Sequence, residues 1–309
     1  MGYMLESGEA FGAGLHRICF EELDSVSREL ARIEDLQPNA IHECRRHLKK
    51  GRSLLQIARF ALPDKKAARV AASCLGQAGR LFASRRDREA VGECLDRALQ
   101  AVEEPGARLV CERIRAHLES APGRGDAAPV DLEESIREAW HLLDSVRATV
   151  RDWSAWEVGA VPLCHGIRRS YRAARDSMKR GRDKKDPEIL HQWRKHAKHL
   201  RHHMMIVSAA WPAFFGMMEV ELHALTDMLG EIHDRALLML YLERQGSEFL
   251  APCEQETALV TLQGLTDREV SLALRAGERL FSEKPAPFGR RISGYIESWV
   301  TGGAGDFKA

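Results

Sequence analysis

The chain has 309 residues, of which 44% are hydrophobic and 29% charged, and its formal net charge is +1. This apolar fraction is sufficient for a buried core and excludes a globally disordered chain. No run approaches the ~18 uncharged apolar residues of a membrane helix, and the first residues lack the basic and apolar regions of a secretory signal. Seven scattered cysteines indicate reduced thiols. We therefore expect a cytoplasmic globular protein without membrane contact.

Apolar residues recur at three- and four-residue spacing along most of the chain, and the alternation typical of strands is not sustained anywhere. We therefore predict an all-α fold. In the first half the predicted helices are Phe11–Ile33, Ala40–Leu62, Asp64–Ala83, Asp87–Glu103 and Ala107–Ser120. In the second half they are Leu132–Arg151, Leu163–Arg180, Pro187–Ala209, Pro212–Gln245, Gln255–Ser282 and Phe288–Val300.

A segment rich in proline, glycine and alanine, Glu119–Pro129, interrupts the helical pattern near the middle of the chain. It predicts a first helical-bundle half, residues 1–120, a linker, residues 121–131, and a second helical-bundle half, residues 132–300. Residues 301–309 are predicted to form a flexible tail. The basic segment Lys179–Lys185 is predicted to be a loop.

The two halves share a basic motif. The first copy, HECRRHLKKGR, runs from His42 to Arg52, and the second, HQWRKHAKHLR, runs from His191 to Arg201. The pair Arg86–Asp87 has a counterpart in the pair His233–Asp234 at nearly the same offset. Repetition over this length indicates duplication of a helical unit and a pseudo-symmetric pair of bundles.

On a helix, each copy of the motif places its cations on one face and its apolar residues, including Leu48 and Trp193, on the other. Like charges at three- and four-residue spacing repel each other, and Glu43 is the one acidic residue within the two copies. A single charge run usually forms a solvated face, but a destabilising run that occurs twice favours an anion-binding surface. Arg168, Arg169, Arg172 and Arg175 add a basic helix segment that the first half lacks.

The motif at His42–Arg52 follows the pattern His-x-x-Arg-x-x-x-(Lys/Arg)-(Lys/Arg)-x-Arg, and a second copy lies at His191–Arg201. Together with the pairs ending in Asp87 and Asp234, these motifs resemble the signatures of the CHAD family, the conserved histidine α-helical domain. The resemblance extends over roughly residues 10–300. It implies two antiparallel four-helix bundles related by a pseudo-twofold axis around a basic central cavity or pore. It also implies non-catalytic binding of inorganic polyphosphate.

On this interpretation the basic residues of both motif copies and of the α-helix before the second copy bind polyphosphate. Arginine offers planar hydrogen-bonding forks to phosphate oxygens and lysine offers point charges. Asp87 and Asp234 are expected to orient Arg or His side chains, and phosphate or sulfate ions are expected in the same site. Because histidine gains charge below its usual pKa of ~6.5, we expect tighter binding at mildly acidic pH. The predicted binding residues are His42, Arg45, Arg46, Lys49, Arg52, His191, Arg194, Lys195, Lys198, Arg201, Arg168 and Arg172.

Three other classes of function fit the sequence less well than polyphosphate binding. An enzyme acting on phosphates needs carboxylates that hold Mg²⁺ or a phosphate-binding loop, and neither pattern is present, so we expect no catalysis and no cofactor. The spacing of His42 and His47 does not match a metal-binding HExxH helix, and His199, His202 and His203 lie among cations, so no metal is expected. Nucleic-acid binding stays the alternative, since basic helices also suit its phosphate backbone, although the near-neutral charge argues against it. The expected location is the cytoplasm, with association with polyphosphate granules as an option.

Overall fold

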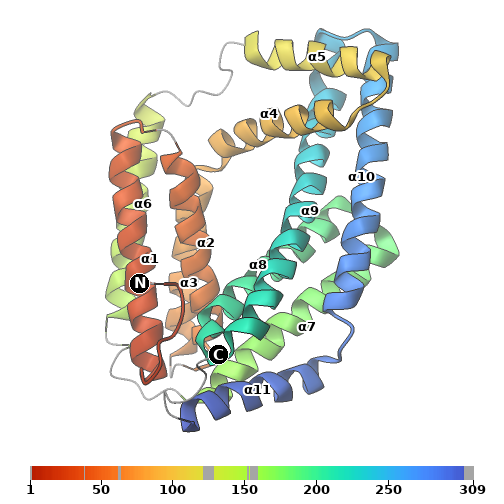
Figure 1. The fold of residues 1–309 in the computed structure, drawn as a ribbon. Helices are drawn as coiled ribbons and strands as arrows, with labels where there is room; N and C mark the ends of the chain where they lie inside the picture. Colours follow the sequence, from red (N-terminus) through yellow and green to blue (C-terminus); the bar gives the residue numbers. More distant parts are fainter. Residues whose placement is uncertain are drawn as a thin grey trace.

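The computed structural model describes residues 2–37, 39–61, 64–120, 129–151, 153 and 159–302, without the side chains of residues 84–90, 119–120 and 129–131. The described residues form α-helices and no strand, which confirms the all-α prediction (Figure 1). None of these helices is long and apolar enough to cross a membrane. The first six are α1 (Phe11–Glu34), α2 (Ala40–Ala58), α3 (Lys65–Leu81), α4 (Ala83–Ala101), α5 (Pro105–Ser120) and α6 (Pro129–Val150). The others are α7 (Ala160–Lys184), α8 (Pro187–Ile206), α9 (Pro212–Gln245), α10 (Pro252–Leu280) and α11 (Pro285–Thr301), with short 3₁₀ helices η2 (Ser208–Ala210) and η3 (Gly246–Glu248).

Proline and capping side chains set the start of α8, one of the two motif helices. Pro187 occupies its first turn, and the Asp186 carboxylate accepts a hydrogen bond from the backbone N–H of Ile189 at 3.0 Å. Proline has no N–H to lose at this position, and the carboxylate satisfies one of the unpaired amides of the first turn. The sequence therefore fixes where the second copy of the motif begins.

The basic segment Lys179–Lys185 is not the predicted loop, because α7 continues through Lys184. Ser177, Met178 and Gly181 are buried on the inner face of this last stretch, so packing holds it helical although its outward-facing residues are charged. Lys185 ends the helix in the left-handed conformation, with φ of 50°.

Helices α1, α2, α3 and α6 form one group, at the left of Figure 1. Within it α2 packs between α1 and α3, and α6 packs on both α1 and α3. Its interior contains Ile18 of α1, Leu55 of α2 and Val146 of α6, all of which are buried. The first motif helix, α2, therefore has two neighbours that bury its apolar face.

Helices α7, α8, α9 and α10 form a second group, in which α8 packs between α7 and α9, and α10 lies against α9. Helix α11 covers α7. Helices α4 and α5 join this group at the top of Figure 1, where α4 packs on α9 and α5 on α10. A separate apolar cluster, which includes Leu95, Cys111, Leu238 and Leu262, holds these four helices together.

The two groups do not coincide with the predicted halves, residues 1–120 and 132–300. Helices α4 and α5 precede the linker but pack on the second group, whereas α6 follows it but packs on the first. A break in composition locates a connection along the chain, but the apolar face of each helix decides its neighbours. Of the predicted linker, residues 121–128 lie outside the described residues, and α6 already begins at Pro129. Of the predicted tail, residues 303–309 also lie outside them. The pseudo-twofold relation stays a prediction.

The main core runs across both groups, because α2 contacts α8 and α7. Leu48 and Trp193 belong to this core, with 2% and 0% of their surface exposed. This confirms the predicted apolar faces of the two motif helices. The basic faces of α2 and α8 must consequently point elsewhere.

Candidate functional site

The two copies of the motif lie next to each other at the crossing of α2 and α8, and Ser53 is at the centre of this contact. Its hydroxyl donates to the Lys49 carbonyl oxygen at 2.9 Å, which leaves its lone pairs to accept from Nδ1 of His199 at 2.7 Å and of His202 at 2.8 Å. His203 Nε2 donates to the Ser53 carbonyl oxygen at 2.8 Å. The network fixes the two helices relative to each other.

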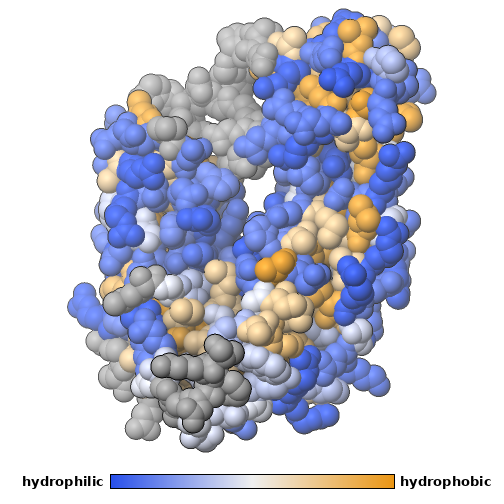
Figure 2. Space-filling view, in the orientation of Figure 1, coloured by the Kyte–Doolittle hydropathy of each residue, from blue (hydrophilic) through white to orange (hydrophobic). Residues whose placement is uncertain are grey.

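A cavity of about 630 Å³ lies beside this crossing, lined by α2, α3, α8, α9 and the start of α4. The space-filling view shows an opening between the two groups of helices, with hydrophilic residues on both sides (Figure 2). Among the described lining residues the only carboxylate belongs to Asp234. Such an excess of positive charge in a concave site favours an anion. The arginine and lysine side chains that line the cavity are Arg45, Lys49, Arg52, Arg80, Arg194, Lys195 and Lys198.

The structure brings most of the predicted binding residues together in this cavity. Those that line it are Arg45, Lys49, Arg52, His191, Arg194, Lys195 and Lys198. Those that are not among its described lining residues are His42, Arg46, Arg201, Arg168 and Arg172. Both motif helices therefore contribute cations to the cavity.

Predicted binding residues that do not line the cavity lie at other places on the helices. His42 is exposed in the first turn of α2. The guanidinium group of Arg201 forms an ion pair with Glu219 of α9, with an N–O distance of 2.6 Å. Arg168 lies against α11, where a Cβ atom on Gly289 would be 2.6 Å from its Cδ.

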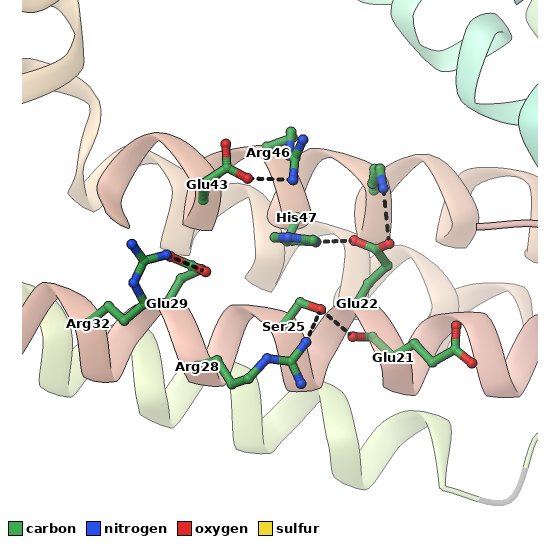
Figure 3. Close-up of polar contacts among 10 residues, drawn as sticks. Glu21, Glu22, Ser25, Arg28, Glu29, Arg32, Glu43, Arg46 and His47 are labelled. Atoms are coloured by element: carbon green, nitrogen blue, oxygen red, sulfur yellow. Dashed lines mark hydrogen bonds and ion pairs between the residues drawn. The ribbon is translucent and has the colours of Figure 1, made fainter. Parts of the chain in front are cut away.

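The opposite side of α2 carries an ion cluster shared with α1 (Figure 3). Arg46 forms an ion pair with Glu43 on the same helix. The Nδ1 atom of His47 lies 2.6 Å from Oε2 of Glu22 on α1, and Lys50 Nζ lies 3.4 Å from Oε1 of the same carboxylate. Glu22 is buried, so the Lys50 ammonium group and the His47 ring provide polar partners for an acid inside the first group of helices. This part of the motif therefore stabilises the fold.

Four arginine or histidine residues of the cavity are absent from the sequence-based prediction: Arg80, His199, His202 and His233. The ring of His233 stacks on that of His191, with 4.0 Å between the centroids. Arg80 lies on α3, outside both motifs.

Gly230 of α9 gives Arg194 room beside the cavity. A Cβ atom at position 230 would lie 2.7 Å from Nη2 and 3.1 Å from Cζ of Arg194. Any larger residue would push this guanidinium group from its place. The short sequence Leu229-Gly230 before the His233–Asp234 pair thus has a role in positioning a motif arginine.

Asp234 lines the cavity and connects it to α4. Its Oδ2 atom lies 3.6 Å from Nη2 of Arg97, which also pairs with Glu231 at 2.7 Å. Asp234 is predicted to orient side chains within its own half, whereas Arg97 belongs to α4, which precedes the linker. A role in orienting the motif cations stays a prediction. The side chain of Asp87, the other residue predicted for this role, lies outside the described residues.

Burial and mutual repulsion shift the protonation of the cavity cations. The pKa of Lys198 falls to about 7, first because of burial and then because of the nearby cations, while Asp227 of α9 acts in the opposite direction. These cations are Arg194 and Arg201 on α8 and Lys49 on α2. The pKa of Arg52 is also lowered, by burial and by Arg80. The empty cavity therefore holds more positive charge than its surroundings compensate.

Three histidines that line the cavity have lowered pKa values. Burial, together with His233 and Lys195, lowers the pKa of His191 to about 4. Burial also lowers the pKa values of His199 and His202 well below their ordinary range. Protonation of these three side chains therefore does not supply the pH dependence expected from the sequence. The group that titrates near neutrality is Lys198.

Metal and thiol chemistry find little support in the described part of the chain. No group of three or more His, Cys, Asp or Glu side chains there is arranged to hold a metal ion. Burial raises the pKa of both Cys19 and Cys44 to about 12, which keeps them as unreactive thiols. The arrangement of the cavity is thus suited to holding an anion by charge.

Comparison with known proteins identifies the fold and the family. A solved structure described as the CHAD domain from the plant Ricinus communis superposes with a TM-score of 0.63 at 16% identity, over 90% of this chain and 94% of that chain. At this identity the likeness shows the fold alone. No curated protein sequence matches the chain significantly. The family model of the CHAD domain matches residues 17–243, well over half of the chain, including both motif copies. The chain therefore belongs to the CHAD domain family.

Proposed function

We propose that this chain binds inorganic polyphosphate in the cavity beside the α2–α8 crossing and does not transform it. The observation that carries the proposal is the excess of arginine and lysine over carboxylate among the described lining residues. A linear polyphosphate has closely spaced negative charges and no bases to be read. Cations one helical turn apart, at intervals of ~5 Å on rigid helices, match such a ligand.

The electrostatics of the cavity support the same ligand class. Lys198 and Arg52 are held where burial and neighbouring cations disfavour their charged forms. A bound polyanion supplies the missing counter-charge and favours those charged forms. Single phosphate or sulfate ions would compete for the cavity but would neutralise fewer cations.

The same lining argues against the other classes. Hydrolysis of phosphates usually depends on several carboxylates that hold Mg²⁺, and Asp234 is the single carboxylate among the described lining residues. Single-stranded nucleic acids are usually held by aromatic platforms, and no Phe, Tyr or Trp is among those residues. These features favour a polyphosphate-binding protein over both other classes, and cytoplasmic location is part of the same proposal.

A titration of the purified protein tests this proposal. Long-chain polyphosphate should bind tightly at low salt and more weakly at high salt, because binding releases counterions from the polymer. Single- and double-stranded DNA, at equal phosphate concentration, should bind more weakly at both salt concentrations. DNA binding as tight as polyphosphate binding would instead support the nucleic-acid alternative, and absence of binding to either polymer would reject the site.

The affinity for polyphosphate should increase as the pH falls from 8 to 6. Lys198 is half protonated near pH 7 in the empty cavity, and a bound polyanion favours its charged form. Proton linkage then tightens binding by up to about tenfold over this range. Lys198→Arg keeps the charge at all these pH values, so its affinity should vary little. Equal pH dependence of the wild type and this variant, measured by titration calorimetry, would contradict the role of Lys198.

A further inference from the structure

Arginines of α7 that do not line the cavity meet cations from the end of α2 and the start of α3. We call this cluster the second basic patch, and its cations are Arg59, Lys65, Arg69, Arg168, Arg169 and Arg172. Arg69 and Arg169 lie close enough to Arg59 to lower its pKa, together with burial. The other α7 arginines and Lys65 surround the exposed ring of His165 and lower its pKa in the same way. The patch therefore joins three helices.

Phe60 holds part of this patch in place. Its ring centroid lies 4.7 Å from the guanidinium carbon of Arg59 and 5.4 Å from that of Arg169. The ring of His165 lies 5.4 Å away. Gly166 permits this approach, since a Cβ atom there would be 2.9 Å from Ile57 and 3.1 Å from Phe60. Cation–π contacts of this kind fix guanidinium groups that solvent would otherwise leave mobile.

The patch has little compensating negative charge within the described residues. No described carboxylate forms an ion pair with any of its six cations. The buried Nε atom of Arg59 has no hydrogen-bond partner among the described residues. Four of the cations are exposed on the surface, namely Lys65, Arg69, Arg169 and Arg172. A surface with this composition favours an anionic ligand with several charges.

Helix α2 connects the patch to the cavity. Arg45, Lys49, Arg52, Gln56 and Arg59 follow each other at spacings of three or four residues, so they share one face of the helix. With a rise of ~1.5 Å per residue, this column extends over about 21 Å. Both Arg52 in the cavity and Arg59 in the patch act on the buried ring of His199. The positive potential is therefore continuous along α2.

We propose that the second basic patch binds the part of a long polyphosphate chain that extends beyond the cavity along α2. The inference rests on the proposed function and adds that the affinity for polyphosphate depends on the length of its chain. A short chain contacts the cavity alone, whereas a long chain also gains the patch. A nucleic acid suits the patch less well, because the Phe60 ring already contacts two guanidinium groups and an imidazole.

Three sets of variants separate the two sites, each removing three exposed positive charges. The patch variant is Arg69→Gln/Arg169→Gln/Arg172→Gln, and the control variant is Arg137→Gln/Arg244→Gln/Arg275→Gln on α6, α9 and α10. A cavity variant, Lys49→Gln/Arg80→Gln/Lys195→Gln, completes the series. Circular dichroism and thermal unfolding check the folds. The double variant Arg69→Gln/Arg172→Gln replaces the patch variant if that one does not fold.

Tripolyphosphate and long-chain polyphosphate are then titrated against each protein. The patch variant should bind tripolyphosphate as the wild type does and the long chain about tenfold more weakly than the control variant. The cavity variant should bind both probes more weakly. If the patch variant binds the long chain as tightly as the control does, the inference is wrong while the proposed function stands. If the wild type binds neither probe, both are wrong. DNA is titrated in parallel, and a loss of DNA binding in the patch variant without a loss of long-chain polyphosphate binding would assign the patch to nucleic acid instead.

Discussion

Replacing Arg52 and Lys198 together by glutamine is expected to weaken polyphosphate binding at least about 100-fold. Both side chains line the cavity and are partly buried in it. A hydrogen bond to a charged group contributes about 1.5–3 kcal/mol, so two such losses correspond to a factor of about 100 or more in affinity. Titration with long-chain polyphosphate at low salt measures the effect.

The same double variant should make the empty protein more stable. The pKa of Lys198 in the folded state, about 7, lies below its ordinary value of 10.5. Folding is therefore opposed by this group below pH 7, and the opposition disappears as the pH rises towards 10.5. After allowance for solvent screening, removal of the charge should stabilise the fold at pH 7 by about 1 kcal/mol. This corresponds to a rise of about 1–2 °C in Tm for a chain of this length, and the gain should shrink at pH 10.

A control with Arg137→Gln/Arg244→Gln removes two exposed cations from α6 and α9. Its affinity for polyphosphate should change less than about threefold, and its Tm should change little, since isolated surface charges contribute about 0–1 kcal/mol. Loss of stability together with loss of binding in the Arg52→Gln/Lys198→Gln variant would mean that these two side chains hold the fold together and do not form a binding site.

The combination of weaker binding and greater stability follows from how the motif is used in the fold. Burial beside other cations, as for Lys198 and Arg52, disfavours the charged form and costs stability in the folded protein. Other basic side chains of the motif have a structural role, as His47 and Lys50 do beside Glu22. The same motif contains both kinds, on different faces of α2. From the sequence alone, these side chains cannot be told apart, because all belong to one basic segment.

Much of the fold was predictable because helical periodicity is a local property. The predicted helix Pro187–Ala209 begins at the observed residue of α8, and Pro212–Gln245 has the bounds of α9. Partners in space are not local, which is why the grouping of α4, α5 and α6 was wrong. The contacts of Leu95 with the α9 and α10 cluster come from parts of the chain far away in sequence.

The candidate site was predictable where the two motif copies repeat and face each other, as with Arg45 and Arg194. It was not predictable where a third helix contributes, as with Arg80 of α3. Nor could the sequence tell that Glu219 pairs with Arg201 or that burial keeps His191 neutral. Both depend on side chains that only the tertiary fold brings together. The repeated face thus locates the site, and the packing decides which of its cations remain available.

Trp193→Ala is expected to cause the largest loss of stability, about 3–5 kcal/mol. Trp193 is on the apolar face of α8 and is fully buried. Its ring packs into a space left by Gly277 of α10, where a Cβ atom would lie 2.5 Å from Cζ2 of the indole. Thermal and denaturant-induced unfolding measure the loss. If the variant is as stable as the wild type, α8 does not depend on this contact.

Gly277→Ala changes the α10 side of the same contact and should lower the free energy of unfolding by about 1–3 kcal/mol through overpacking. In the double variant the new methyl group enters the space vacated by the indole, so the two effects should not add. Because Trp193 faces the core and not the cavity, the folded Trp193→Ala protein should keep its polyphosphate affinity within about threefold at low temperature. A tenfold loss in the folded variant would show that the apolar face of α8 also shapes the binding site. Retained affinity would assign neighbouring positions of one motif, Trp193 and Arg194, to two separate tasks: holding the helix in place and holding the anion.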